Sequence, residues 1–221
     1  MPLTIPEALR LLRTFWAELD WPFAPSAAAA EATLERLRQQ AGRPLPPPLE
    51  AYVRLAIPTR PLVLEQVGNP LTLYSLSELS LTQPGYSHDA RTGQSLPDWP
   101  ATWLLLGDLG ADPVVLDLAA PGEAVSQYYH GEGAWESGSI LADSIGQFLL
   151  CAATLHHALT GITPGQPALA TAADGQLLLV PTAAAWLQPR LREWAGPYAQ
   201  EWAGPLANAL PPTPLRKPRL P

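Results

Sequence analysis

The chain has 221 residues, enough to bury a hydrophobic core without a metal ion or a disulfide, and 47% of them are hydrophobic. Its 20 acidic and 13 basic residues give a net charge of −7, which repels nucleic-acid phosphates and favours a cationic protein partner. The single cysteine, Cys151, excludes an intramolecular disulfide and paired-cysteine metal sites.

The sequence predicts a cytoplasmic protein with no membrane span. Charged residues interrupt the N-terminal segment MPLTIPEALRLLRTFW, so we expect no secretory signal. The longest uncharged stretch, residues 144–173, is broken by polar residues, glycine and prolines, and is therefore unsuited to crossing a bilayer.

Three helices are predicted at the start of the chain. Thr4 and Glu7 form a capping-box pattern, and apolar residues then recur at helical spacing as far as Leu19. Ser26 is placed to cap a second helix, which stops at Gly42. A third helix is expected between the prolines at 46–48 and Pro58.

The next hundred residues have the pattern of an antiparallel sheet. PLVLEQV and PLTLYSL are short branched runs typical of strands. Residues 84–100 lack periodicity and predict a surface loop. The runs TWLLLG, PVVLDL and AVSQYY, separated by turn-forming residues, then predict a meander.

A closing helix is expected from Ser144, which forms a second capping-box pattern with Gln147, to Gly161. We predict one domain over residues 1–165. Residues 166–221 form an extension that packs on it, with a short strand within 168–180, a helix at 182–194 kinked by Pro189, and a proline-rich basic tail.

The segment GDLGADPVVLDL places Asp108, Asp112 and Asp117 within twelve residues. Its spacing does not match a calcium-binding loop. Instead, Asp108 and Asp112 are expected to hydrogen-bond backbone amides in a turn. Strand alternation places Asp117 on the face that carries Val115, directed toward solvent or a partner.

No catalytic or metal-binding motif is evident, so we predict a protein that is not an enzyme and uses no cofactor or metal. The four histidines form no metal-binding pair, and Cys151 is expected to be a small buried side chain. A hydrolase site formed by His130, Glu132 and Glu136 is a weaker alternative.

The segment YYHGEGAWESGS mixes aromatic, acidic and glycine residues, a composition that suits the rim of a binding surface. Tyr128 and Trp135 either complete the core or contact a partner, whereas Glu132 and Glu136 are expected to be exposed.

Residues 31–155 resemble the SUKH superfamily, which includes Smi/Knr-type cell-wall regulators and bacterial immunity proteins. The resemblance lies in AEATLERLRQQAGRPLPPPLEAYVRLA, then WLLLGDLGADPVVLDL, AVSQYYHGE and SIGQFLLCAATL, in that order. It implies an α+β fold, with a mostly antiparallel sheet flanked by N-terminal helices and a closing helix. It further implies a protein-binding role, typically the neutralisation of a toxin, often a nuclease.

We therefore expect an immunity protein whose acidic face binds a basic toxin domain. The candidate partner-binding residues are Asp108, Asp112, Asp117, Glu123, Glu132 and Trp135. The main alternative is a regulatory or scaffold adaptor whose proline-rich tail recruits another protein.

Overall fold

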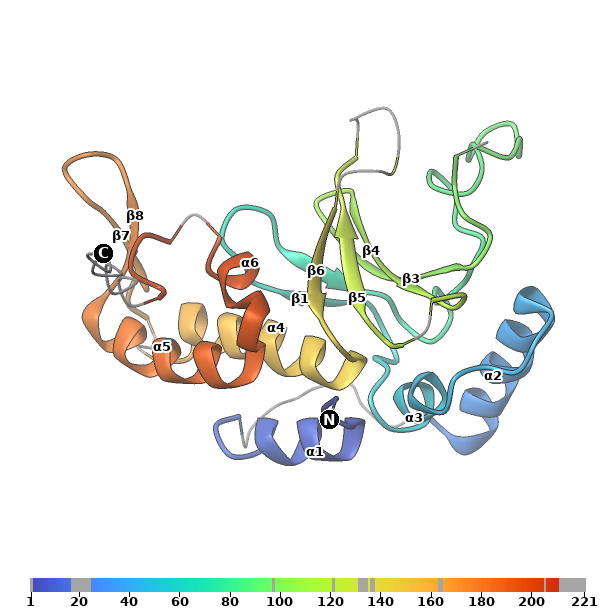
Figure 1. Ribbon diagram of the computed structural model, residues 1–221, viewed down its shortest axis with the longest axis horizontal. Helices are drawn as coiled ribbons and strands as arrows, with labels where there is room; N and C mark the ends of the chain where they lie inside the picture. Colours follow the sequence, from blue (N-terminus) through green and yellow to red (C-terminus); the bar gives the residue numbers. More distant parts are fainter. Residues whose placement is uncertain are drawn as a thin grey trace, which may run out of the picture.

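The structure is a computed structural model, and it describes residues 2–16, 25–96, 98–120, 122–130, 135, 138–162, 165–204 and 206–210. A six-stranded antiparallel sheet forms its centre, with the strands in chain order. Helices α1 and α4 lie beneath this sheet in Figure 1, with α5 beside α4, and the connection between β2 and β3 projects on its other side. The α+β fold with a mostly antiparallel sheet, predicted from the sequence, is confirmed.

The helices and strands follow one another from the N-terminal to the C-terminal end of the described chain. They are α1 (Ile5–Leu12), α2 (Ala27–Ala41), α3 (Pro47–Leu55), β1 (Leu62–Leu64), β2 (Leu71–Leu73), β3 (Trp103–Leu109), β4 (Asp112–Asp117), β5 (Val125–Tyr128), β6 (Gly138–Ala142), α4 (Ile145–Thr160), β7 (Leu169–Thr171), β8 (Leu177–Leu179), α5 (Pro181–Ala195), the 3-10 helix η1 (Gly196–Tyr198) and α6 (Ala199–Ala203).

Local side-chain hydrogen bonds explain where several helices begin. Thr4 and Glu7 form the predicted capping box of α1, and the Ser26 hydroxyl accepts from the Ala29 amide at the start of α2. Ser144 caps α4 through the Gln147 amide, but the Gln147 side chain accepts from Asp143 rather than from Ser144. These bonds satisfy amides that no helical carbonyl reaches.

Helix α1 ends earlier than its apolar pattern predicts. The pattern continues to Leu19, whereas the helix stops at Leu12. The Thr14 hydroxyl donates to the Leu11 carbonyl at 2.6 Å, a local bond that competes with helical hydrogen bonding. Residues 17–24, which include Leu19, lie outside the described part of the chain.

One large core lies between the sheet and the helices. Alternate strand residues such as Leu104, Leu106, Val114 and Leu116 point into it and meet α4, whose buried residues include Cys151. The burial of Cys151 agrees with the prediction, and that burial raises the pKa of its thiol.

The chain after residue 165 contributes to this same core. Leu179, Leu187, Leu191 and Trp202 are buried in one cluster with residues of α1 and α4. A two-stranded hairpin, β7–β8, stands where a single strand was expected, and α5 carries Pro189 in its interior. The proline-rich tail, residues 211–221, is outside the described residues.

The two histidines of α4 lie against aromatic side chains. Trp16 stacks on His156, and Phe15 and Trp186 pack around His157. His157 is therefore only partly exposed, because Trp186 of α5 packs on its ring. Among the described residues, no helix is both long enough and apolar enough to cross a membrane.

Candidate functional site

The sheet has a second apolar layer, on the side away from α4, which we call the outer face. Strand alternation directs Trp103 and Leu105 of β3 and Val115 of β4 to this side, opposite the main core. Val115 is only 1% exposed, because aromatic side chains cover it. The outer face is thus not a bare polar surface.

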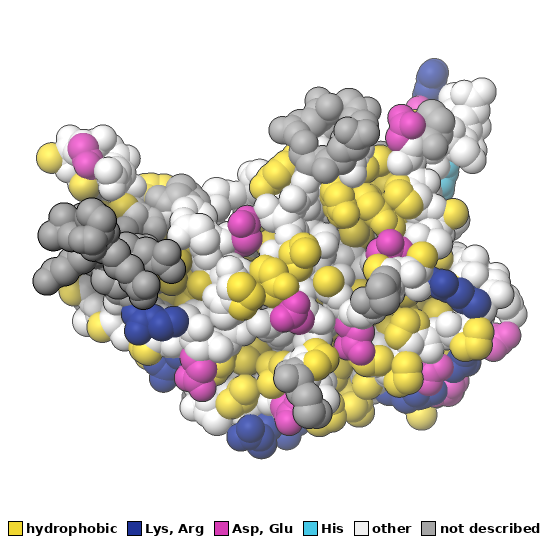
Figure 2. All heavy atoms as spheres, viewed as in Figure 1, with side chains coloured by type: hydrophobic (Ala, Val, Ile, Leu, Met, Phe, Trp, Pro, Cys, Tyr) yellow, Lys and Arg dark blue, Asp and Glu magenta, His cyan; other side chains and the backbone are white. Residues whose placement is uncertain are grey.

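Six aromatic residues, which we call the aromatic patch, build this layer. Three come from strands or their ends, two from the connection between β2 and β3, and one from the connection between β5 and β6. They are Tyr74, Tyr86, Trp99, Trp103, Tyr128 and Trp135. Figure 2 shows hydrophobic side chains gathered beside the projecting connection between β2 and β3, where this layer lies.

The rings of the aromatic patch contact one another directly. Trp99 meets Trp103 and Trp135 edge to face, with centroid distances of 5.4 Å in both pairs. Tyr86 packs against Trp99 at 5.5 Å. Such pairs stabilise by roughly 0.5–1.5 kcal/mol beyond the area that they bury, so the patch is a preorganised surface.

Tyr128 and Trp135 combine the two roles that the sequence left open, core residue and contact residue. Both belong to the aromatic patch, and both stay partly exposed. They finish a small second core and also present ring surface to solvent. A partner could therefore contact them without any unfolding of the sheet.

Asp108 lies on the outer face, beside the tyrosines of the patch. It is paired with Thr72 on one side and with Pro113 on the other, in the middle of the sheet. Burial and then the Asp108 carboxylate raise the pKa of Tyr74, and the same two causes raise the pKa of Tyr86 to about 12. Both phenols are therefore neutral donors at physiological pH.

Asp117 lies on the same face at the far end of β4. Its Oδ1 accepts from the Thr102 hydroxyl at 2.7 Å and from the Ala119 amide at 2.8 Å. Its charge adds to burial in raising the pKa of Tyr128. Asp117 thus shapes the turn after β4 and places a negative charge at the edge of the aromatic patch.

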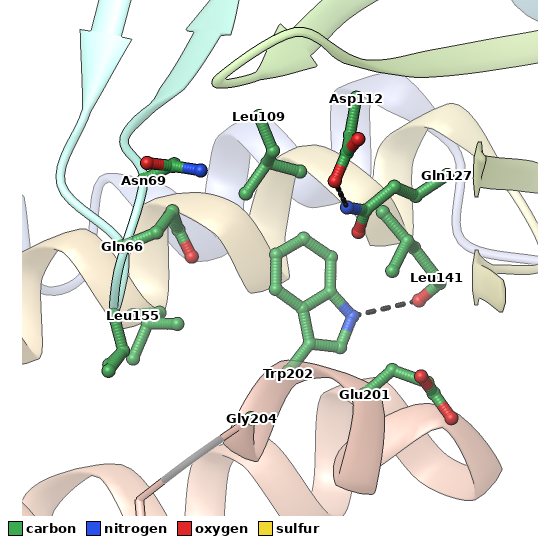
Figure 3. A pocket seen from close by; sticks show the side chains of 11 residues that line it. Gln66, Asn69, Leu109, Asp112, Gln127, Leu141, Leu155, Glu201, Trp202 and Gly204 are labelled. Carbon is green, nitrogen blue, oxygen red and sulfur yellow. Dashed lines mark hydrogen bonds between the residues drawn. The ribbon is translucent and has the colours of Figure 1, made fainter. Parts of the chain in front are cut away.

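Asp112 lies on the opposite side of the sheet, so it does not join Asp108 and Asp117. Its Oδ1 accepts from the His130 amide at 2.8 Å, and its Oδ2 accepts from Nε2 of Gln127 at 3.3 Å. The carboxylate lines a pocket against Trp202, as Figure 3 shows. The expectation of one acidic face that includes all three aspartates is therefore wrong.

The predicted turn chemistry of Asp108 and Asp112 also requires correction. Both are strand residues, and the hairpin turn consists of Gly110 and Ala111 alone, each with a positive φ. A two-residue turn of this kind matches the right-handed strand twist without help from side chains. Gly107 lies outside this turn. Glycine is required at this position because a Cβ there would lie 2.1 Å from the Thr72 carbonyl oxygen.

The remaining candidate residues are Glu123, Glu132 and Glu136. Glu123 lies in the connection between β4 and β5, where burial raises the pKa of its carboxyl group. Glu132 and Glu136 lie outside the described residues, and so does the hydrolase arrangement with His130 that depends on them. Among described residues, no three acidic, histidine or cysteine side chains are grouped to hold a metal ion.

Sequence reasoning missed Tyr74, Tyr86, Trp99 and Trp103 as members of the site. For Trp103 a signal existed, because alternation within TWLLLG separates it and Leu105 from the two leucines that face the core. Tyr86 and Trp99 belong to an aperiodic segment, which gives no face to assign.

No protein-family model matches the chain, and a search of the curated proteins finds no match to it either. The resemblance to the SUKH superfamily stays a prediction from the sequence.

Proposed function

We propose that this chain is a non-enzymatic protein-binding module and that the outer face of its six-stranded sheet is the binding surface. The observation that carries the proposal is the aromatic patch, flanked on its own face by Asp108 and Asp117. Tryptophan and tyrosine are enriched among the few residues that dominate binding energy in protein interfaces, because their rings bury large areas at a low cost in side-chain entropy.

The charge of the molecule favours a basic partner. The net charge is −7, and the two aspartates of the outer face add local negative potential next to the exposed rings. A lysine or arginine on the partner would meet both an aromatic ring and a carboxylate there. Complementary charge of this kind speeds encounter and selects among partners.

An unpaired donor in the patch favours a local shift of one tryptophan ring on binding, while the stacked floor of the patch keeps its geometry. The indole Nε1 of Trp99 is buried and has no hydrogen-bond partner among the residues that the structure describes. A buried donor without an acceptor costs roughly 1–3 kcal/mol. A partner that offers a carbonyl or carboxylate to a slightly displaced Trp99 ring would recover this energy.

Combined with the resemblance of residues 31–155 to SUKH immunity proteins, these features lead us to propose that the partner is a basic toxin domain, such as a nuclease, and that binding neutralises it. The test is co-expression with the product of the neighbouring gene, followed by purification at about 50 mM and about 500 mM salt. Co-purification of a basic toxin domain that weakens at high salt supports the proposal. Recovery of the chain alone at both salt concentrations would count against it.

A further inference from the structure

A pocket on the other side of the sheet has a lining that selects for one kind of ligand. It lies where the β3–β4 hairpin and β5 approach α6, and it encloses about 200 Å³. Figure 3 shows the Trp202 ring standing in this space below Leu109, with Asp112 and Gln127 on one side and Gln66 on the other. Trp202 is held in place, because its Nε1 donates to the Leu141 carbonyl at 2.8 Å.

The amide groups of the pocket are oriented by hydrogen bonds to fixed acceptors. Nε2 of Gln66 donates to the Ala152 carbonyl at 3.2 Å, and Nε2 of Gln127 donates to Asp112. Since a carbonyl or a carboxylate only accepts, each amide must turn its nitrogen to that partner and its oxygen the other way. Within the described residues, no donor is bonded to either amide oxygen, although Gln66 is only 9% exposed.

The charged groups of the pocket are all negative. Asp112 and Glu201 line it, and the described lining contains no lysine, arginine or histidine. The Glu201 side chain is exposed and makes no hydrogen bond within the described part of the chain. The polar groups that face a ligand beside the Trp202 ring are two amide oxygens, the Glu201 carboxylate and the remaining lone pairs of Asp112, together with the neutral Asn69 amide, which can donate or accept. The charge and most of these groups favour a cationic donor.

We infer that this pocket is a binding site for a guanidinium group. A guanidinium carries a positive charge, five N–H donors in one plane and a flat surface that stacks on tryptophan. It matches acceptors on two sides of an aromatic ring better than an ammonium group, which has three donors and no flat face. The group belongs either to a free small guanidine or to an arginine side chain of a protein.

The site is independent of the proposed function. Asp112 points to the side of the sheet opposite Asp108 and Asp117, so a ligand here would not touch the aromatic patch. Loss of binding at one site therefore leaves binding at the other unchanged, and each has its own experiment.

The test is a titration of the whole chain with methylguanidinium, followed by the NMR signal of the Trp202 indole N–H, which a Trp202→Phe variant identifies among the eight tryptophans. Methylurea, which is planar and of similar size but neutral, is the matched ligand. We expect a saturable shift with methylguanidinium, and binding of methylurea at least about tenfold weaker.

Two variants with the same change of charge sharpen the test. Glu201→Gln should weaken methylguanidinium binding about threefold, whereas Glu193→Gln, on the exposed surface of α5 outside this pocket, should leave it unchanged. N-acetylarginine amide separates the two sources of the group. Binding as tight as that of methylguanidinium indicates an arginine side chain, and weaker binding indicates a free small guanidine.

The inference is overturned if the indole signal does not shift saturably, or if methylurea binds as tightly as methylguanidinium. Equal binding by Glu201→Gln and Glu193→Gln would overturn it as well, because the charge of the pocket would then be irrelevant.

Discussion

Trp103 of β3 and Tyr128 of β5 stack with their ring centroids 4.1 Å apart and their planes inclined by 30°. The strand between them, β4, contributes Val115 and Asp117 to the same face. The two rings thus join strands that are not neighbours, and they form the floor of the aromatic patch. This contact fixes the geometry of the proposed binding surface before any partner arrives.

The charge of the outer face gives a first prediction. Asp108→Asn keeps the shape of the side chain and removes one negative charge from the patch. Its association rate with a basic partner should fall by about tenfold at low salt, with a smaller fall at high salt, because electrostatic steering is screened. Stopped-flow or surface-based kinetics at two salt concentrations measures this. An unchanged rate at low salt would show that Asp108 does not steer the encounter.

The β3–β4 hairpin gives a prediction about stability. Ala111 has a φ of 89°, a value that alanine adopts at a cost of roughly 1–2 kcal/mol, whereas glycine adopts it freely. Ala111→Gly should therefore raise the free energy of unfolding, by up to about 1 kcal/mol after the added flexibility of the unfolded chain is subtracted.

The matched control is Ala120→Gly, at an exposed position after β4 without a positive φ. It should lower the free energy of unfolding, because only the entropic cost of glycine remains. Urea denaturation of both variants decides the matter. A loss of stability in Ala111→Gly equal to that in Ala120→Gly would contradict the strained turn.

The sequence alone predicts those features of the structure that depend on residues close together in the chain. The bounds of α2, α3 and α4 follow from caps and apolar spacing within each segment, so they were predictable. Strand β6 was missed, since Gly138–Ala142 is short and offers little alternation. The position of Asp112 depends on where the hairpin turns, and GDLGAD offers two glycines at which it could do so.

The site was less predictable than the fold. Tyr86 and Trp99 reach the outer face from a loop whose course only tertiary contacts determine. Gln66, Gln127 and Trp202 meet in the guanidinium pocket, although each lies more than sixty positions from the next in the chain. The sequence did not predict α6, the helix that carries Trp202. The charge and the aromatic content pointed to a binding surface, but its location required the folded sheet.

Tyr52, which is buried, and Tyr198, which is partly exposed, yield a third prediction. The Tyr52 hydroxyl lies in the core without a hydrogen-bond partner in the described part of the chain, and burial raises the pKa of this phenol. Tyr52→Phe should leave stability unchanged or raise it by about 1 kcal/mol, because an unpaired polar group is removed.

Tyr198→Phe is the comparison, since the Tyr198 hydroxyl donates to Oδ1 of Asp143 at 2.5 Å. That variant should lose up to about 1 kcal/mol. Thermal or urea unfolding of both proteins provides the measurement. If Tyr52→Phe were the more damaging change, the core hydroxyl would have a partner after all.

His156 makes stability depend on pH. Its Nδ1 accepts from the Glu65 amide at 2.8 Å, a bond that needs the neutral ring, and burial lowers the pKa of His156 below 6.5. As pH falls through 6.5, the unfolded chain takes up a proton that the folded chain refuses, so the free energy of unfolding decreases.

His156→Gln removes this titration while it keeps an oxygen that can accept from Glu65. Its loss of stability between pH 8 and about pH 5 should be smaller than that of the wild-type chain, with the two curves parallel above pH 7. The glutamates Glu7, Glu31 and Glu50, whose pKa values hydrogen bonds lower, act only at more acidic pH. A difference between the two proteins that stays constant down to pH 5 would contradict the role given to His156.

The most direct test of the binding surface compares two lysine substitutions of equally exposed apolar residues. Ile140 is 46% exposed on the outer face of β6, and Leu55 is 45% exposed at the end of α3. Titration of the co-purified toxin domain into each variant should show that Ile140→Lys weakens binding by at least about tenfold, while Leu55→Lys binds as the wild type does. Equal affinity of the two variants for the toxin domain would show that the partner binds elsewhere.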